Sequence, residues 1–195
     1  MYLSRIDIDS SSPSARKALA SPEVMHAIIE KCFETSERNL WRIDGLRLLV
    51  VSTALPSYPE AALQLGELPV SKDYDPFLSK IIEGNIYCFR LTANPVHSIK
   101  MSSGERGKVL AHVTISQQID WLGKKAEKFG CKPKQFSITE SGFVIFRRQG
   151  KQVTLKLATF EGNLIVTDRE LFVAALTGGV GRGKAYGAGM LTVMR

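Results

Sequence analysis

The sequence has few of the residues that usually bind metals or form disulfide frameworks. Its 195 residues include three cysteines and three histidines. Cys32, Cys88 and Cys131 lie far apart without a CxxC pair, so we expect buried free thiols and neither a disulfide framework nor a zinc site. The histidines show no HxxxH or HxH spacing. The sequence therefore predicts no dedicated transition-metal site.

Long apolar runs are also missing. No stretch approaches the roughly 18 consecutive apolar residues that a membrane-spanning helix needs. The N-terminal MYLSRIDIDS alternates apolar and polar residues and lacks the regions of a signal peptide. With 44% hydrophobic and 23% charged residues, the composition is typical of a globular protein. We therefore expect a cytoplasmic protein without membrane partners.

Positive charge is concentrated in the second half of the chain. The net charge is +7, but residues 1–97 carry −2 and residues 98–195 carry +9. A basic half beside a nearly neutral one indicates a polyanionic partner, with nucleic acid the first candidate. A soluble protein that is basic without such a partner is the alternative.

The order of predicted elements in the first half is strand, helix, strand, strand, helix, strand. Ser21 and Pro22 are typical of a helix start, and Asp44-Gly45 is typical of a hairpin turn. The expected elements are a strand in MYLSRIDID, a helix from Pro22 to about Phe33, strands in RNLWRID and LRLLVVSTAL, a helix at 60–65 and a strand in NIYCFRLTA. This order indicates a ferredoxin-like unit.

The second half repeats a similar plan after a polar loop at 98–112. Its expected elements are a helix in QQIDWLGKKAEKFG, a hairpin in FVIFRRQGKQVTLKLATF, a strand in GNLIVTD, a helix in RELFVAAL and a strand in MLTVM. We therefore predict an α+β protein of two tandem ferredoxin-like domains, with residues 1–94 in the first and 95–195 in the second.

The stretch GGVGRGKAYGAGM, residues 178–190, nearly matches a nucleotide-binding phosphate loop. Gly183-Lys184 fits the motif, but Ala185 has no hydroxyl for magnesium, and a predicted helix precedes the stretch where a strand is required. We therefore expect no nucleotide cofactor. Two interpretations stay open: close packing at glycines, or approach of backbone amides to the phosphates of a polynucleotide.

GVGRGKAYGAGMLTV resembles the C-terminal signature of the type I-E CRISPR repeat-processing endoribonucleases, RAMP superfamily proteins of the CasE type that belong to the Cascade complex. MYLSRIDI, FRLTANPV, IDWLGKKAEKFG and FEGNLIVTD resemble further family segments in the same order. The resemblance implies two ferredoxin-like domains. It also implies metal-independent cleavage of CRISPR repeat RNA at the base of its stem-loop, by attack of the substrate's own 2′-hydroxyl.

The resemblance also implies a catalytic residue. The family's catalytic histidine matches His26, which the helix pattern places beside the apolar stripe, either facing outward or at the rim of the core. Members often carry a tyrosine three residues earlier, where this chain has Glu23. An acid there repels the scissile phosphate, so we expect a second-domain cation such as Lys151 to assist His26.

The hairpin turn and the glycine-rich stretch are the expected RNA contacts. The turn corresponds to a family hairpin that enters the RNA groove, and the alternative is an ordinary solvated tip. The predicted RNA-binding residues are Arg147, Arg148 and Lys151 of the turn, Arg182, Lys184, Gly181 and Gly183 of the glycine-rich stretch, and Lys100 and Lys108.

Three further histidine and tyrosine side chains complete these expectations. Tyr186 is expected either to stack on a base or to fill the core, whereas His97 and His112 are interpreted as structural.

The expected partners are the crRNA stem-loop and other Cascade subunits. The main alternative function is a non-catalytic crRNA-binding RAMP scaffold.

Overall fold

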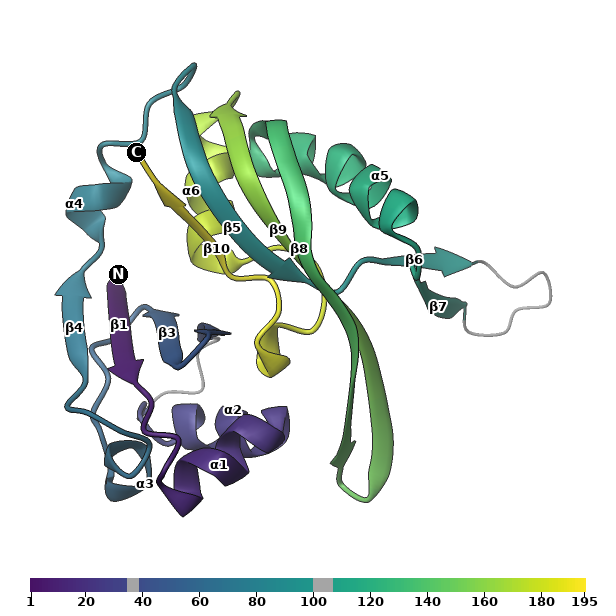
Figure 1. Ribbon diagram of the computed structural model, residues 1–195. Coiled ribbons are helices and arrows are strands. Elements are labelled where there is room, and N and C mark those ends of the chain that lie inside the picture. The colour runs from purple at the N-terminus through teal and green to yellow at the C-terminus, as the bar shows by residue number, and fades with distance from the viewer. Residues whose placement is uncertain (35–38, 100–106) are drawn as a thin grey trace.

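The computed structural model describes residues 1–34, 39–99 and 107–195. Two four-stranded antiparallel sheets dominate this part of the chain, and a short two-stranded hairpin projects from the second half (Figure 1). The α+β class and the tandem ferredoxin-like plan predicted from the sequence are confirmed.

The first half folds around the sheet with the order β2-β3-β1-β4. Its elements are β1 (Tyr2–Asp7), α1 (Pro13–Ala20), α2 (Pro22–Glu30), β2 (Leu40–Asp44), β3 (Arg47–Ser52), α3 (Glu60–Leu63), β4 (Val70–Asp73) and α4 (Asp75–Leu78). This is a βαββαβ unit in which the first strand lies between the third and fourth.

The second half builds a sheet with the equivalent order, β10-β5-β9-β8. Its elements are β5 (Ile86–Ala93), β6 (Val96–Ile99), β7 (Lys108–Ala111), α5 (Ile115–Ala126), the 3-10 turn η1 (Glu127–Phe129), β8 (Cys131–Arg148), β9 (Lys151–Val166), α6 (Arg169–Gly178), the 3-10 turn η2 (Lys184–Tyr186) and β10 (Leu191–Met194). Strands β6 and β7 form a hairpin inserted between β5 and α5.

The pairing corrects the place of one predicted strand. NIYCFRLTA was expected to close the first unit, but β5 pairs with β9 and β10 and opens the second. Alternation of buried residues identifies a strand without saying which sheet receives it. The strand that closes the first sheet, β4, is short and mostly exposed, so it lacks that signal. The division after residue 94 stays a prediction, and the pairing favours a junction between β4 and β5.

Two further differences concern local structure. SSSPSARKALA, for which no element was predicted, contains α1, which Ser12 caps by accepting from the Ala15 amide at 3.4 Å. The predicted polar loop at 98–112 contains β7 and the end of β6. Helix α2 starts at Pro22 as predicted, with Ser21 as its cap, and it ends at Glu30 instead of near Phe33.

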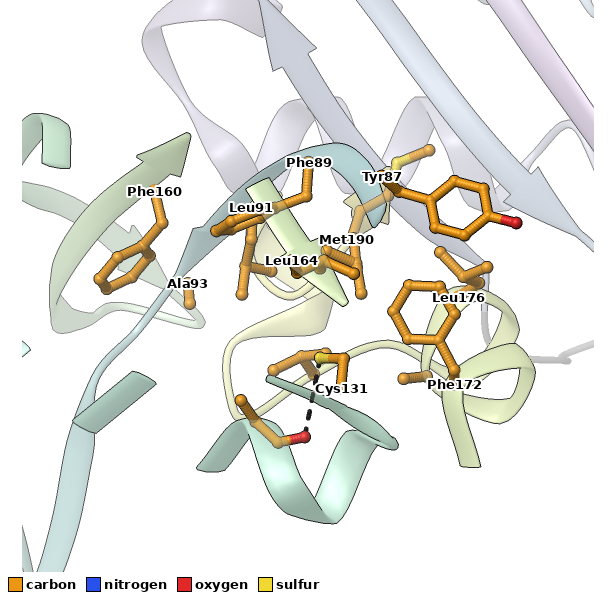
Figure 2. Packing of buried hydrophobic residues seen from close by; sticks show 14 of the residues in the cluster. Tyr87, Phe89, Leu91, Ala93, Cys131, Phe160, Leu164, Phe172, Leu176 and Met190 are labelled. Atoms are coloured by element: carbon orange, nitrogen blue, oxygen red, sulfur yellow. Dashed lines mark hydrogen bonds between the residues drawn. The ribbon is translucent and has the colours of Figure 1, made fainter. Parts of the chain in front are cut away.

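The main core lies between the second sheet and helices α5 and α6. Figure 2 shows Phe89, Leu91, Leu164 and Phe172 within it, and Cys131, whose thiol donates to the Ala126 carbonyl at 3.7 Å. Burial raises the pKa of Cys131 to about 12.

The other two thiols differ from each other. Cys32 is buried as predicted, and burial raises the pKa of its thiol to about 11. Cys88 is exposed, so the expectation of buried thiols was wrong there, although all three cysteines are free.

One buried guanidinium joins the two sheets. Arg42, on β2, is 2% exposed. It donates two bonds to Asp44 at 2.7 and 2.6 Å, and three more to the Arg90 carbonyl at 3.0 Å, the Met190 carbonyl at 2.8 Å and the Thr192 hydroxyl at 2.8 Å. All five donors of Arg42 are therefore satisfied. Three of these bonds reach the second sheet or the segment leading into β10.

The charge network continues from this side chain. The Arg90 Nε lies 3.1 Å from an Asp44 oxygen, and its Nη1 lies 2.8 Å from Glu161 on β9. Carboxylates and guanidiniums thus alternate from β2 to β9, which balances the buried charge of Arg42.

Replacing Arg42 with alanine removes the guanidinium that donates hydrogen bonds to both Asp44 and the Met190 carbonyl. Because loss of one partner of a buried ion pair is costly, we expect the free energy of unfolding to fall by about 3–5 kcal/mol, as measured by urea denaturation. Arg47→Ala is the matched control: its side chain is 68% exposed and 3.6 Å from Asp7, so the decrease there should stay below about 1 kcal/mol. Equal decreases in both variants would show that Arg42 does not join the sheets.

Candidate functional site

Helix α2 holds His26 at the edge of the first core. Met25 and Ile29 of the same helix are buried, whereas the His26 side chain is 33% exposed. Its Nδ1 lies 3.7 Å from a Glu30 oxygen and has no hydrogen-bond partner among the described residues. The rim position expected from the sequence is therefore confirmed, and an imidazole edge is open to a reactant.

Tyr186 brings three elements together at this histidine. Its ring meets His26 edge-on, with centroids 6.3 Å apart and planes at 68°. The Phe146 ring of β8 also packs against Tyr186, with the ring centroids 4.6 Å apart. The Arg148 guanidinium carbon lies over the Tyr186 ring, 5.9 Å from its centroid. Tyr186 thus links α2, the glycine-rich stretch and the long hairpin. It fills a junction between elements and does not sit in the core.

The hairpin β8–β9 reaches this junction because it is longer than its neighbours. Strand β5 pairs with β9 only from Ala158 to Ile165, so residues 143–155, the hairpin tip, extend past the sheet (Figure 1). Gln149 and Gly150 both have positive φ, 48° and 77°. This is the conformation of a two-residue type I′ turn, whose twist matches the paired strands.

The tip presents two predicted cations to the His26 side. Arg148 and Phe146 are two residues apart and both contact Tyr186, so they share one face of β8. Lys151 stands directly opposite Arg148 and lies on the same face. Arg147 is paired with Gln152 and faces the other way. Like charges opposite each other repel, and an anion between Arg148 and Lys151 would relieve that repulsion.

Part of the glycine-rich stretch packs against the first sheet. A Cβ added at Gly187 would lie 2.8 Å from the Trp41 ring, and one at Gly179 would lie 2.6 Å from Leu40. Both glycines have positive φ, as do Gly181 and Gly183. The close-packing interpretation is therefore confirmed for Gly179 and Gly187.

The cations predicted in and near this stretch lie in different places. The Lys184 ammonium donates to the Gly178 carbonyl, whereas Arg182 is exposed next to Asn94, with which it forms a β-bridge. Lys108 is exposed at the start of β7, and Lys100 lies outside the described residues. The structure therefore brings Arg148 to the ring that contacts His26, with Lys151 on the same face of the hairpin, and Arg182 and Lys108 lie elsewhere.

Sequence reasoning missed Phe146 and the contact between Tyr186 and His26. Phe146 is an apolar residue in an alternating strand pattern, which gives no sign that it supports a site. One signal was present in the sequence: Phe146 stands two residues before Arg148, so their side chains lie on the same face of the strand. Because Phe146 is buried, that face is the one turned toward the junction.

Two negative findings belong to the described residues. Within this part of the chain, no group of three histidine, cysteine, aspartate or glutamate side chains is arranged to hold a metal ion. No described helix is long and apolar enough to cross a membrane.

Comparison with known proteins identifies the family. A family model described as CRISPR-associated protein matches residues 1–195. The chain belongs to this CRISPR-associated family. It is 31% identical, over 99% of both chains, to the Thermus thermophilus protein named CRISPR-associated endoribonuclease Cse3. The resemblance noted in the sequence is therefore confirmed as a family relationship of the CasE type.

Solved structures of the family agree with this fold. A structure of CRISPR endoribonuclease Cse3 bound to a 19-nucleotide RNA matches with a TM-score of 0.83 and 29% identity, over the whole of both chains. The Escherichia coli K-12 protein Cas6e matches with a TM-score of 0.74 and 20% identity, over 99% of this chain and 98% of that one. The latter similarity supports the fold alone.

We expect Tyr186 to hold the hairpin tip against α2 through its ring. In Tyr186→Ala the amides of residues 144–154 should exchange hydrogen about tenfold faster, since an aromatic contact contributes about 0.5–1.5 kcal/mol. Hydrogen exchange followed by mass spectrometry measures this. Tyr186→Phe is the control, because it keeps the ring and should leave the exchange unchanged. If both variants exchange like the parent protein, the ring does not restrain the tip.

Proposed function

We propose that this protein is a metal-independent endoribonuclease that cleaves CRISPR repeat stem-loops in precursor crRNA. The family relationship and the similarity to an endoribonuclease bound to RNA support the substrate class. The observation that carries the proposal is the junction at Tyr186, whose ring contacts both the partly exposed His26 imidazole of the first unit and the Arg148 guanidinium of the second. Lys151 stands opposite Arg148 on the same face of the hairpin. General acid–base catalysis and phosphate charge stabilisation require these groups.

The proposed step is a transfer within the substrate. The 2′-oxygen forms a bond to the adjacent phosphorus, and the bond from phosphorus to the 5′-oxygen breaks. The proton of the 2′-hydroxyl passes to a base, and the 5′-oxygen takes up a proton from water or from the protonated base as it leaves. The product carries a 2′,3′-cyclic phosphate, or a 3′-phosphate once water opens the ring. The nucleophile belongs to the RNA, so the protein supplies only proton transfer and charge.

The described residues suggest a division of these roles. Glu30 faces Nδ1 of His26, which leaves Nε2 as the nitrogen that accepts the 2′-hydroxyl proton. Arg148 and Lys151 stabilise the charge that develops on the phosphate oxygens. Other members of the family often carry a tyrosine at the position of Glu23. In this proposal the cations of the tip take the role of that tyrosine.

We further propose that the protein keeps the crRNA hairpin bound after cleavage and joins the other Cascade subunits. Arg147, on the outer face of the tip, then contacts the stem, Lys184 contacts the stem phosphates, and Arg182 contacts phosphates of the adjoining RNA. The alternative function, a crRNA-binding scaffold without catalysis, uses the same contacts. The two functions differ only in what happens at His26.

Replacing His26 with alanine should lower the single-turnover rate of repeat cleavage by about 10²–10⁴-fold, the usual contribution of one acid–base group. The affinity for the repeat hairpin should remain within about twofold, because His26 contributes proton transfer and no charge contact. His26→Asn is the matched variant, since it keeps a polar side chain of similar size. Cleavage at the parental rate in both variants would remove His26 from the mechanism and favour the scaffold.

The nucleophile and the metal requirement are tested together. A labelled repeat should be cut at the same rate in EDTA as in magnesium, and a single 2′-deoxy substitution before the scissile phosphate should abolish the cut. Gel analysis of the fragments measures both. Cleavage of the deoxy substrate would disprove attack by the 2′-hydroxyl, and loss of activity in EDTA would disprove metal independence.

A further inference from the structure

A cationic pocket lies on the second unit, apart from the residues of the proposed active site. It has a volume of about 810 Å³ and lies between α5, strand β6 with the residues that follow β7, and the start of the glycine-rich stretch. This volume falls in the range of small-molecule sites, roughly 300–1,000 Å³. Nothing in the proposed cleavage step uses it.

Positive charge dominates the lining. Four cations line the pocket, Lys124, Lys125, Lys128 and Arg182, against one carboxylate, Asp120. Lys124 and Lys128 are four residues apart, so they project from the same side of α5 and η1. Among the described residues, none of these four cations forms an ion pair. The pocket therefore holds uncompensated positive charge, which favours an anion.

Neutral polar groups complete the wall. The rings of His97 and His112 lie 4.6 Å apart and tilted by 37°, so the two histidines interpreted as structural form a pair in the pocket. Burial, His97 and Lys124 lower the pKa of His112, which Asp120 raises in part. His112 Nδ1 and Asn94 Oδ1 are buried without a hydrogen-bond partner in the described part of the chain. Unsatisfied groups of this kind are rare unless a ligand or water completes them.

The glycine-rich stretch connects this pocket to His26. Gly181 and Arg182 line the pocket, and Tyr186 meets His26. Tyr186 comes four positions after Arg182, and an extended chain of that length spans at most about 14 Å. A polynucleotide held at His26 can therefore reach the pocket within a few nucleotides.

We propose that this pocket binds the single-stranded RNA that flanks the repeat stem next to the cleavage site. Lys124, Lys128 and Arg182 hold its phosphates, and the exposed His97 ring stacks on a base. This inference rests on the proposed function and extends it, because it gives the enzyme a contact outside the stem.

The chemistry of the lining favours a single strand over a duplex. Proteins recognise unpaired RNA by stacking splayed bases on aromatic or histidine rings and by hydrogen bonds to base edges. A concave site with a ring pair and unsatisfied acceptors suits a splayed nucleotide. A paired stem presents only its backbone and grooves, and the hairpin tip is the element shaped to contact those.

Binding assays in a His26→Ala background test this without cleavage. Three labelled RNAs are compared by fluorescence anisotropy: the repeat hairpin alone, the hairpin with a 5′ single-stranded extension, and the hairpin with a 3′ extension. Lys124→Ala/Lys128→Ala removes two exposed cations of the pocket. Lys72→Ala/Lys80→Ala is the control, with the same charge change on exposed lysines of the first half, near β4 and α4 and far from α5 in Figure 1.

We expect the pocket variant to bind at least one extended RNA roughly tenfold more weakly, and the salt dependence to become shallower by about 0.7 for each phosphate that is no longer neutralised. Its affinity for the bare hairpin should stay within about twofold, and the control should bind all three RNAs like the parent protein. Equal weakening on bare and extended RNAs, equal weakening in the control, or no weakening would overturn the pocket assignment. Failure of the parent protein to bind any repeat RNA would instead refute the proposed function, and the pocket assignment with it.

Discussion

The site depends on the contact that Arg42 makes between the two sheets. A guanidinium with all five donors satisfied fixes β2 against β5 and the segment before β10. His26 is carried by the first unit, whereas Arg148, Lys151 and Tyr186 are carried by the second. No single unit contains the proposed chemistry, so the relative position of the sheets sets the distance between proton transfer and charge stabilisation. Buried ion pairs are weak sources of stability but strong constraints on geometry once formed.

Tyr186 then transmits that geometry to the reacting groups. Its ring touches an imidazole from α2 and two side chains from the hairpin tip, and Gly187 lets its loop approach Trp41 closely. The sequence of this stretch nearly matches a phosphate loop. The structure gives Gly179 and Gly187 a packing function instead, and the same stretch supplies Tyr186 to the proposed active site and Gly181 and Arg182 to the cationic pocket.

Much of this arrangement could be predicted from local patterns. Strand alternation, the Ser21 cap and the Asp44-Gly45 turn identified β1, α2, β2 and β3 of the first unit, and the charge asymmetry located the basic half. The place of β5 could not be predicted, because its alternation fits either sheet equally well. The contact of Tyr186 with His26 joins residues 160 positions apart, and no local pattern reports such a contact. The contact of Arg42 with the second sheet could not be predicted either, because a charged residue in a strand usually faces solvent.

The projecting hairpin has a consequence for how its length can change. Residues along each strand alternate between the side that faces His26 and the side that faces away, so Arg148 and Arg147 occupy opposite sides. Shortening or lengthening both strands by an even number of residues keeps the same parity at the tip. An odd change exchanges the two arginines, which turns the cation meant for the scissile phosphate outward and brings the one meant for the stem inward. Parity, more than reach, limits how this hairpin can vary.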